Sequence, residues 1–98
     1  MKTPSAVEYQ LLALVVRERS GREVAKAYQA ETGKSISYGT LYVVLGRLQE
    51  QGWVKVRDDQ DVDGRIRYFK ITGLGAKALA STRRWYRSQA KFGFRCSG

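Results

Sequence analysis

The chain has 98 residues, 43% of them hydrophobic, and eighteen lysines and arginines against nine acidic residues give it a net charge of +9. A single domain of this size buries a modest core, and so large an excess of positive charge is typical of proteins that bind nucleic acid. The sequence contains no histidine and one cysteine, Cys96, which counts against most enzymes, cysteine-based metal sites and disulfide-bonded secreted proteins.

The first helix is expected over residues 4–19, with Thr3 as its N-cap and Pro4 at the first helical position. Its apolar residues recur at helical spacing. They are Val7, Leu11, Leu12, Leu14, Val15 and Val16. This apolar face is wide, so a second surface should cover part of it. Ser20 and Gly21 are expected to end the helix.

The second helix is expected over residues 21–32, with Gly33 at its C-terminus. Its apolar stripe consists of Val24, Ala25, Ala27 and Tyr28. The third helix begins after the N-cap Ser37, runs to Gln51 and is closed by Gly52. Its buried stripe follows the i, i+3, i+4, i+7 rule. It consists of Leu41, Val44, Leu45 and Leu48.

After Gly52 the pattern changes from helical to alternating. Residues 53–57 and 65–71 alternate apolar with polar or basic side chains, which predicts the two strands of a β-hairpin, joined by a polar turn at residues 58–64. Thr72 then caps a last helix from Gly73 to Lys91, and a loose tail follows. The apolar side of this helix is expected to comprise Leu74, Ala78, Leu79, Trp85 and Tyr86.

This order of elements predicts a mainly α protein with a small β-hairpin, a winged helix-turn-helix (α-α-α-β-β-α). The second helix of such a motif enters the major groove of DNA, which assigns that role to residues 38–51. The outward face of this helix carries Gly39, Val43, Gly46, Arg47 and Glu50. Each glycine costs about 1 kcal/mol relative to alanine. Close approach of DNA would offset that cost. The equally weighted alternative is that this surface simply tolerates glycine and that the two glycines have no function.

Spaced motifs extend this interpretation to a family. The segment Ser37-Tyr38-Gly39-Thr40-Leu41-Tyr42, followed by Arg47-Leu48 and Gly52-Trp53-Val54, resembles the reading helix of PadR-like transcriptional regulators. The segment from Gly64 to Thr72 resembles their wing, and the likeness covers about residues 7–80. The resemblance implies a winged-helix repressor that forms a homodimer through its C-terminal helix and binds an inverted-repeat operator in double-stranded DNA.

The helix face, the wing and the resemblance together indicate the site residues. We expect Val43 to contact a thymine methyl group and Arg47 to contact a guanine edge or a phosphate. Arg65 and Arg67 are expected to contact the DNA backbone or the minor groove. The expected DNA-binding residues are Ser37, Tyr38, Gly39, Thr40, Tyr42, Val43, Gly46, Arg47, Arg65 and Arg67. The expected dimerisation residues are Leu11, Leu79, Trp85 and Tyr86.

The sequence departs from the family pattern at Tyr38, Val43 and Gly46, the last of which stands where a basic residue is usual. Residues 73–98 hold six basic and no acidic residues, which either flank DNA or form a solvated face. We expect a winged-helix unit over residues 1–72, a dimerisation helix over residues 73–92 and a flexible tail over residues 93–98. Trp53 is expected in the core, and Trp85 suggests a small aromatic ligand near the dimer interface.

Acidic residues of the wing also match part of a known metal-binding pattern. Asp59, Asp61 and Asp63 match the first half of a calcium-binding loop, but Lys70 replaces its bidentate glutamate, so we expect an acidic wing tip, no metal and no cofactor. A winged helix that binds only protein, like an antirepressor, and a small basic RNA-binding protein are the alternative functions. No apolar run approaches the about 20 residues of a membrane span. The lone cysteine fits a reducing cytosol. With the family resemblance, we expect a cytoplasmic protein of a bacterium or phage, associated with the nucleoid when bound to DNA.

Overall fold

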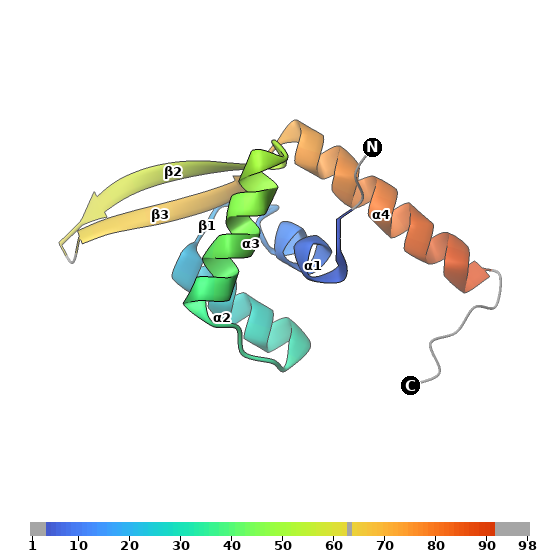
Figure 1. The fold of residues 1–98 in the computed structure, drawn as a ribbon, viewed down its shortest axis with the longest axis horizontal. Coiled ribbons are helices and arrows are strands. Elements are labelled where there is room, and N and C mark those ends of the chain that lie inside the picture. The colour runs from blue at the N-terminus through green and yellow to red at the C-terminus, as the bar shows by residue number, and fades with distance from the viewer. Residues whose placement is uncertain (1–3, 63, 92–98) are drawn as a thin grey trace.

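The structure, a computed structural model, describes residues 4–62 and 64–91. Its elements in chain order are α1 (Ala6–Leu14), β1 (Arg19–Ser20), α2 (Gly21–Thr32), α3 (Tyr38–Glu50), β2 (Val54–Asp61), β3 (Gly64–Ile71) and α4 (Gly73–Lys91). The hairpin of β2 and β3, here called the wing, and α4 extend from opposite sides of the body that α1, α2 and α3 form (Figure 1). The predicted fold class, a winged helix-turn-helix, is confirmed. The expected flexible tail, with Cys96, lies outside the described residues.

The first helix is shorter than predicted at both ends. It begins after Ser5 and not after Thr3, because the Ser5 hydroxyl accepts a hydrogen bond from the Glu8 amide at 3.2 Å and the Glu8 carboxylate accepts one from the Ser5 amide at 2.8 Å. This reciprocal capping box sets the start of α1. The helix ends at Leu14, because the Val15 carbonyl accepts a hydrogen bond from the Ile71 amide of β3 at 2.8 Å.

A short strand replaces the predicted end of the first helix. Arg19 and Ser20 form β1, which pairs antiparallel with β3 opposite Phe69 and Tyr68. The three-stranded sheet has the order β1-β3-β2. Two residues are too few to show an alternating pattern, so β1 becomes visible only when β3 lies beside it.

The wing is longer than predicted, and the polar turn expected at residues 58–64 was wrong. β2 continues to Asp61, and its register with β3 runs from Val54 opposite Ile71 to Asp61 opposite Gly64. Asp58 lies opposite Arg67, and the Asp58 carboxylate bridges the Arg67 guanidinium at 3.2 Å. This cross-strand ion pair stabilises an aspartate within an exposed strand. The acidic composition of the segment by itself indicated a turn. Asp63 lies outside the described residues.

The second and third helices have the predicted bounds to within one residue. The Ser20 hydroxyl caps α2 in a capping box with Glu23, and Gly33 ends it with a φ of 74°. Ser37 caps α3, and Gly52, with a φ of 78°, follows its end. A side chain other than glycine rarely adopts such positive φ values. The predicted stripe of α3 is buried in full: Leu41, Val44, Leu45 and Leu48.

The core lies between α1, α2 and α3, the root of the wing and the first half of α4. Its members that are fully buried are Leu11, Leu12, Val15, Val24, Leu41, Leu45 and Leu48. Trp53 is 5% exposed and belongs to the core, as predicted. In α4, Ala78, Leu79 and Thr82 are buried.

The predicted apolar side of the last helix was only partly correct. Leu74, Trp85 and Tyr86 are 51%, 57% and 45% exposed. Trp85 and Tyr86 lie in the second half of α4, which continues past the body, so that few of the described residues cover them (Figure 1). Leu74 lies in the first turn of α4, and its exposure does not have this cause. None of the described helices is both long and apolar enough to cross a bilayer.

Candidate nucleic-acid interface

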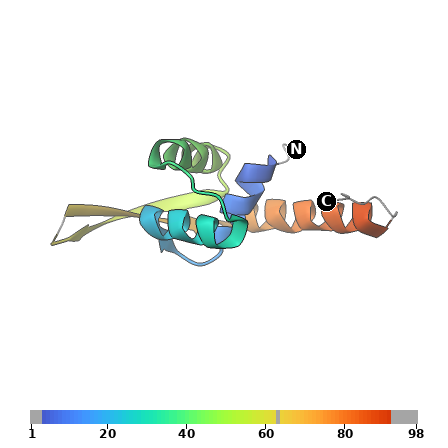
Figure 2. The same cartoon turned by 90° about the horizontal axis from the view of Figure 1, so that it is seen from below.

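The face of α3 that points away from the core is open. Val43 at its centre is 56% exposed, and a Cβ atom added to Gly39 or Gly46 would meet no other atom within 4 Å. Arg47 is exposed on the same face and forms no ion pair with any residue in the described part of the chain. In the view of Figure 2, α3 lies to one side of the wing.

The residues at the start of α3 hold the helix end in place. The Ser37 hydroxyl accepts a hydrogen bond from the Thr40 amide at 3.2 Å and donates one to the Thr40 hydroxyl at 3.0 Å. Ser37 and Thr40 are nevertheless exposed to solvent. Tyr38 beside them is 51% exposed, and its ring stacks on that of Tyr42 with centroids 6.4 Å apart.

Tyr42 differs from the other expected site residues because it faces α2 and β3. Its ring lies 6.0 Å from that of Phe69, centroid to centroid, at an interplanar angle of 47°. Its phenol group fills the space that a Cβ atom on Gly21 would need. The ring therefore connects α3 to the start of α2 and to the sheet, and it is still 43% exposed.

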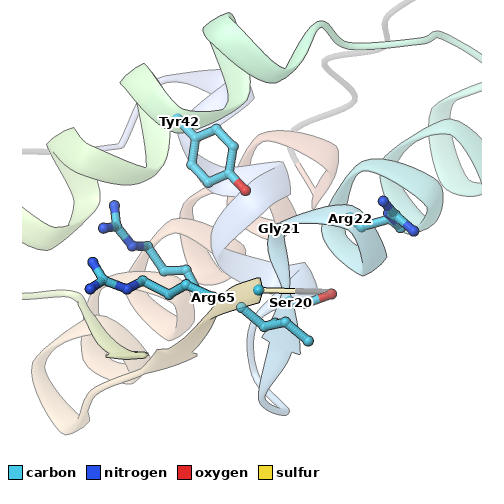
Figure 3. A pocket seen from close by; sticks show the side chains of 8 residues that line it. Ser20, Gly21, Arg22, Tyr42 and Arg65 are labelled. Carbon is cyan, nitrogen blue, oxygen red and sulfur yellow. The ribbon is translucent and has the colours of Figure 1, made fainter. Parts of the chain in front are cut away.

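A hollow of about 290 Å³ opens between α3, the start of α2 and the wing. The residues that line it are Ser20, Gly21, Arg22, Tyr42, Gly64, Arg65, Ile66 and Arg67. Figure 3 shows the Tyr42 hydroxyl directed from α3 toward Gly21, with Arg65 on the strand side and Arg22 at the opposite rim. The hollow thus brings together three of the expected residues, Tyr42, Arg65 and Arg67, and adds five that were not among the expected site residues: Ser20, Gly21, Arg22, Gly64 and Ile66.

Arginines on the wing differ in how firmly acidic side chains hold them. Arg67 is bound to Asp58, while Arg65 forms no ion pair with the described residues. On the wing, Arg57 bridges Glu18 at 2.9 Å and Asp59 at 3.1 Å, and its guanidinium lies 4.5 Å from the centre of the Tyr68 ring. Arg65 is therefore the wing arginine most available to an external anion.

These contacts also shift the pKa values of the charged groups that take part in them. The hydrogen bond from Arg57 lowers the pKa of Glu18, and the backbone amide of Gln60, followed by Arg57, lowers the pKa of Asp59. The same two carboxylates raise the pKa of Arg57. Asp58 and Asp59 are thus engaged with arginines of the wing itself, so they repel an approaching polyanion less than two free carboxylates would.

The expected dimerisation residues fall into two groups. Leu11 and Leu79 are 0% and 4% exposed, so they pack in the core of this chain and have almost no surface left to offer a second copy. Trp85 and Tyr86 are exposed and in contact, with ring centroids 5.1 Å apart, and Tyr86 lies 5.5 Å from Tyr9 of α1. These three rings form an aromatic surface on α1 and α4, which we call the α4 aromatic cluster.

The model of the transcriptional regulator PadR-like family matches residues 11–81 of the chain. A comparison with curated protein sequences found no match.

Solved structures resemble the fold at low sequence identity. A PadR family transcription regulator from Clostridium difficile R20291 has a TM-score of 0.78 at 22% identity, over 90% of this chain and 94% of that one. A transcriptional regulator from Clostridium thermocellum has a TM-score of 0.78 at 23% identity, over 94% and 90% of the two chains. Bacillus subtilis PadR, solved in complex with operator DNA, has a TM-score of 0.70 at 22% identity, over 79% of this chain and 47% of that one. These likenesses show the shared fold.

Proposed function

Because this chain belongs to the PadR-like family of transcriptional regulators, we propose that it binds duplex DNA as a homodimer and represses transcription at an inverted repeat. The observation that carries the proposal is the open face of α3, which bears two glycines and Arg47, beside a wing whose Arg65 forms no ion pair within the described residues. The proposed units are residues 1–72 for DNA and residues 73–92 for dimerisation. A cytoplasmic location and a small aromatic ligand at the α4 aromatic cluster complete the proposal.

Residues at the start and on the open face of α3 have proposed roles in binding DNA. Val43, at the centre of the open face, suits the methyl group of a thymine, and Arg47 suits a guanine edge. Gly39 and Gly46 let the helix backbone approach the groove, because no side chain stands between them and the ligand. The hydroxyls of Ser37 and Thr40 hold the N-terminal end of α3. In this proposal they place the first turn of the helix against the sugar-phosphate backbone of the DNA.

The salt dependence of binding tests this function. We expect the logarithm of the association constant for duplex DNA to fall linearly with the logarithm of the salt concentration. Arg47 and Arg65 of two protomers would by themselves release about four counterions, which corresponds to a slope of about −3.6. Fluorescence anisotropy at several salt concentrations measures the slope, with a duplex recovered from a random-sequence pool as the probe.

The same titrations separate the alternative functions. A random duplex and an RNA of the same length, at matched salt, serve as comparisons. Equal binding of RNA would favour the RNA-binding alternative, and a flat salt response would remove DNA binding as the main function and favour a protein-binding winged helix.

A second prediction concerns the homodimer. The chain has a mass of 11.1 kDa, so light scattering at micromolar concentration should give a particle of twice that mass. Replacing Trp85 with serine removes a large exposed aromatic side chain from the α4 aromatic cluster and should raise the dimer dissociation constant about tenfold or more. Val62→Ser is the matched control, because Val62 is 97% exposed on the wing. A monomer-sized particle from the unaltered chain would contradict the proposal.

A further inference from the structure

The hollow beneath Tyr42 has the composition of an anion site. Three arginines and a phenol hydroxyl line it, and none of the described residues in its lining is acidic. Its volume of about 290 Å³ exceeds the about 30 Å³ of one water molecule severalfold, so a phosphodiester group fits together with some water. Arg22 and Arg65 form no ion pair within the described residues, and Arg67 is held by Asp58 from the neighbouring strand.

The Tyr42 ring is fixed at the wall of this hollow. It stacks on Tyr38, tilts against Phe69 and lies over Gly21, three contacts that come from three different elements. A ring held on three sides directs its hydroxyl in one direction, toward the start of α2, as Figure 3 shows. That direction differs from the one in which the open face of α3 points, so the hydroxyl is not among the groups that reach base edges there.

The start of α2 adds backbone donors to the same wall. The Ser20 hydroxyl is already used, since it accepts a hydrogen bond from the Glu23 amide at 3.2 Å. Gly21 and Arg22 lie in the first turn of α2, where amide groups have no acceptor within the helix. Because Gly21 has no side chain, the Tyr42 phenol can lie close to this backbone.

We propose that this hollow seats one phosphate of the DNA backbone, with the Tyr42 hydroxyl and the Arg65 guanidinium as its side-chain donors. The inference rests on the DNA-binding function proposed above and assigns Tyr42 a positioning role in place of base reading. A phosphate held between α2, α3 and the wing sets how the reading helix lies relative to the backbone, because contacts to phosphates fix register without carrying sequence information.

Replacing Tyr42 with phenylalanine tests the role of the hydroxyl while leaving the ring contacts in place. Affinity should fall about tenfold, as expected for one hydrogen bond to a charged group. The loss should be the same for the selected duplex and for a random duplex, and the salt slope should not change, because tyrosine is neutral. Arg65→Gln should also weaken both duplexes equally, but it should reduce the salt slope by about two, one for each protomer of the dimer.

Tyr28→Phe is the matched control, since Tyr28 packs in the core and belongs neither to the hollow nor to the α4 aromatic cluster, and its affinity should equal that of the unaltered chain. Thermal unfolding confirms that each variant is folded. If Tyr42→Phe binds both duplexes as tightly as the unaltered chain, or loses affinity only for the selected one, the inference is wrong. If the unaltered chain binds no duplex at all, the proposed function itself fails.

A scan of the DNA backbone locates the phosphate. Single methylphosphonate groups, which are uncharged, replace the phosphates of the selected duplex one at a time. One position per half-site should weaken the unaltered chain markedly and the Tyr42→Phe variant much less, because the hydroxyl and that phosphate form one interaction. If the hollow served a free phosphate ion instead, the effects at every position would be additive with Tyr42→Phe, and the proposal would be overturned.

Discussion

Replacing Gly46 with glutamate is expected to reduce the affinity for duplex DNA more than a hundredfold while leaving the fold intact. Gly46 lies on the open face of α3 beside Val43, where an added side chain meets no atom of the protein within 4 Å. The new carboxylate would face the phosphates and the groove, and juxtaposed like charges cost several kcal/mol. Stability should stay level or rise, because glycine is about 1 kcal/mol less favourable than alanine in a helix and glutamate is a better helix former than glycine.

The control for this variant carries the same charge change elsewhere. Ala30 is exposed on α2, so Ala30→Glu lowers the net charge equally without placing the charge on α3. Gly46→Ala separates the effect of bulk from that of charge. Anisotropy titrations measure affinity, and light scattering and thermal unfolding check the assembly and the fold. A Gly46→Glu protein that folds, dimerises and binds the selected duplex as tightly as the unaltered chain would show that α3 is not the reading helix.

Replacing Gly75 with alanine is expected to lower the free energy of unfolding by about 1–3 kcal/mol, as overpacking does elsewhere. A Cβ atom there would overlap the backbone carbonyl oxygen of Trp53 and lie 2.8 Å from the Ile71 side chain. The Trp53 carbonyl cannot move away freely, because it accepts a hydrogen bond from the Thr72 amide at 2.9 Å. The first turn of α4 must therefore lift from the root of the wing.

Gly73→Ala provides a matched control two positions earlier in the same helix. A Cβ atom on Gly73 meets nothing within 4 Å, so stability should stay level or rise slightly. Denaturant unfolding at one fixed chain concentration measures both variants, since the stability of a dimer depends on concentration. Equal midpoints for the two alanine variants would mean that α4 does not dock on Trp53 as described.

Local sequence signals determined the parts of this protein that depend on near neighbours in the chain. α2 and α3 have their predicted bounds because Ser20, Gly33, Ser37 and Gly52 act on backbone groups within a few residues of themselves. The buried stripe of α3 was predictable for the same reason, since helical spacing alone brings its four residues to one side. The open face with Gly39, Val43, Gly46 and Arg47 is the complement of that stripe.

Only the tertiary structure decided the features that depend on distant segments. The end of α1 is set by the hydrogen bond between Val15 and Ile71, and the length of the wing by cross-strand pairs such as Asp58 with Arg67. Leu11 and Leu79 have apolar patterns that suit an interface as well as a core, and packing placed them in the core.

The hollow at Tyr42 illustrates the same division between local and distant contacts. Spacing on α3 places Tyr42 on a flank of the helix, but the ring lies where Gly21 leaves room and Phe69 supplies a wall, and both are distant in sequence. Residues of α2, α3 and β3 meet there because three elements pack together, and a pattern read along one segment carries no information about that meeting. The sequence alone therefore determined which helix presents an open face, while the packing of α2 and the wing against that helix decided where an anion site can form.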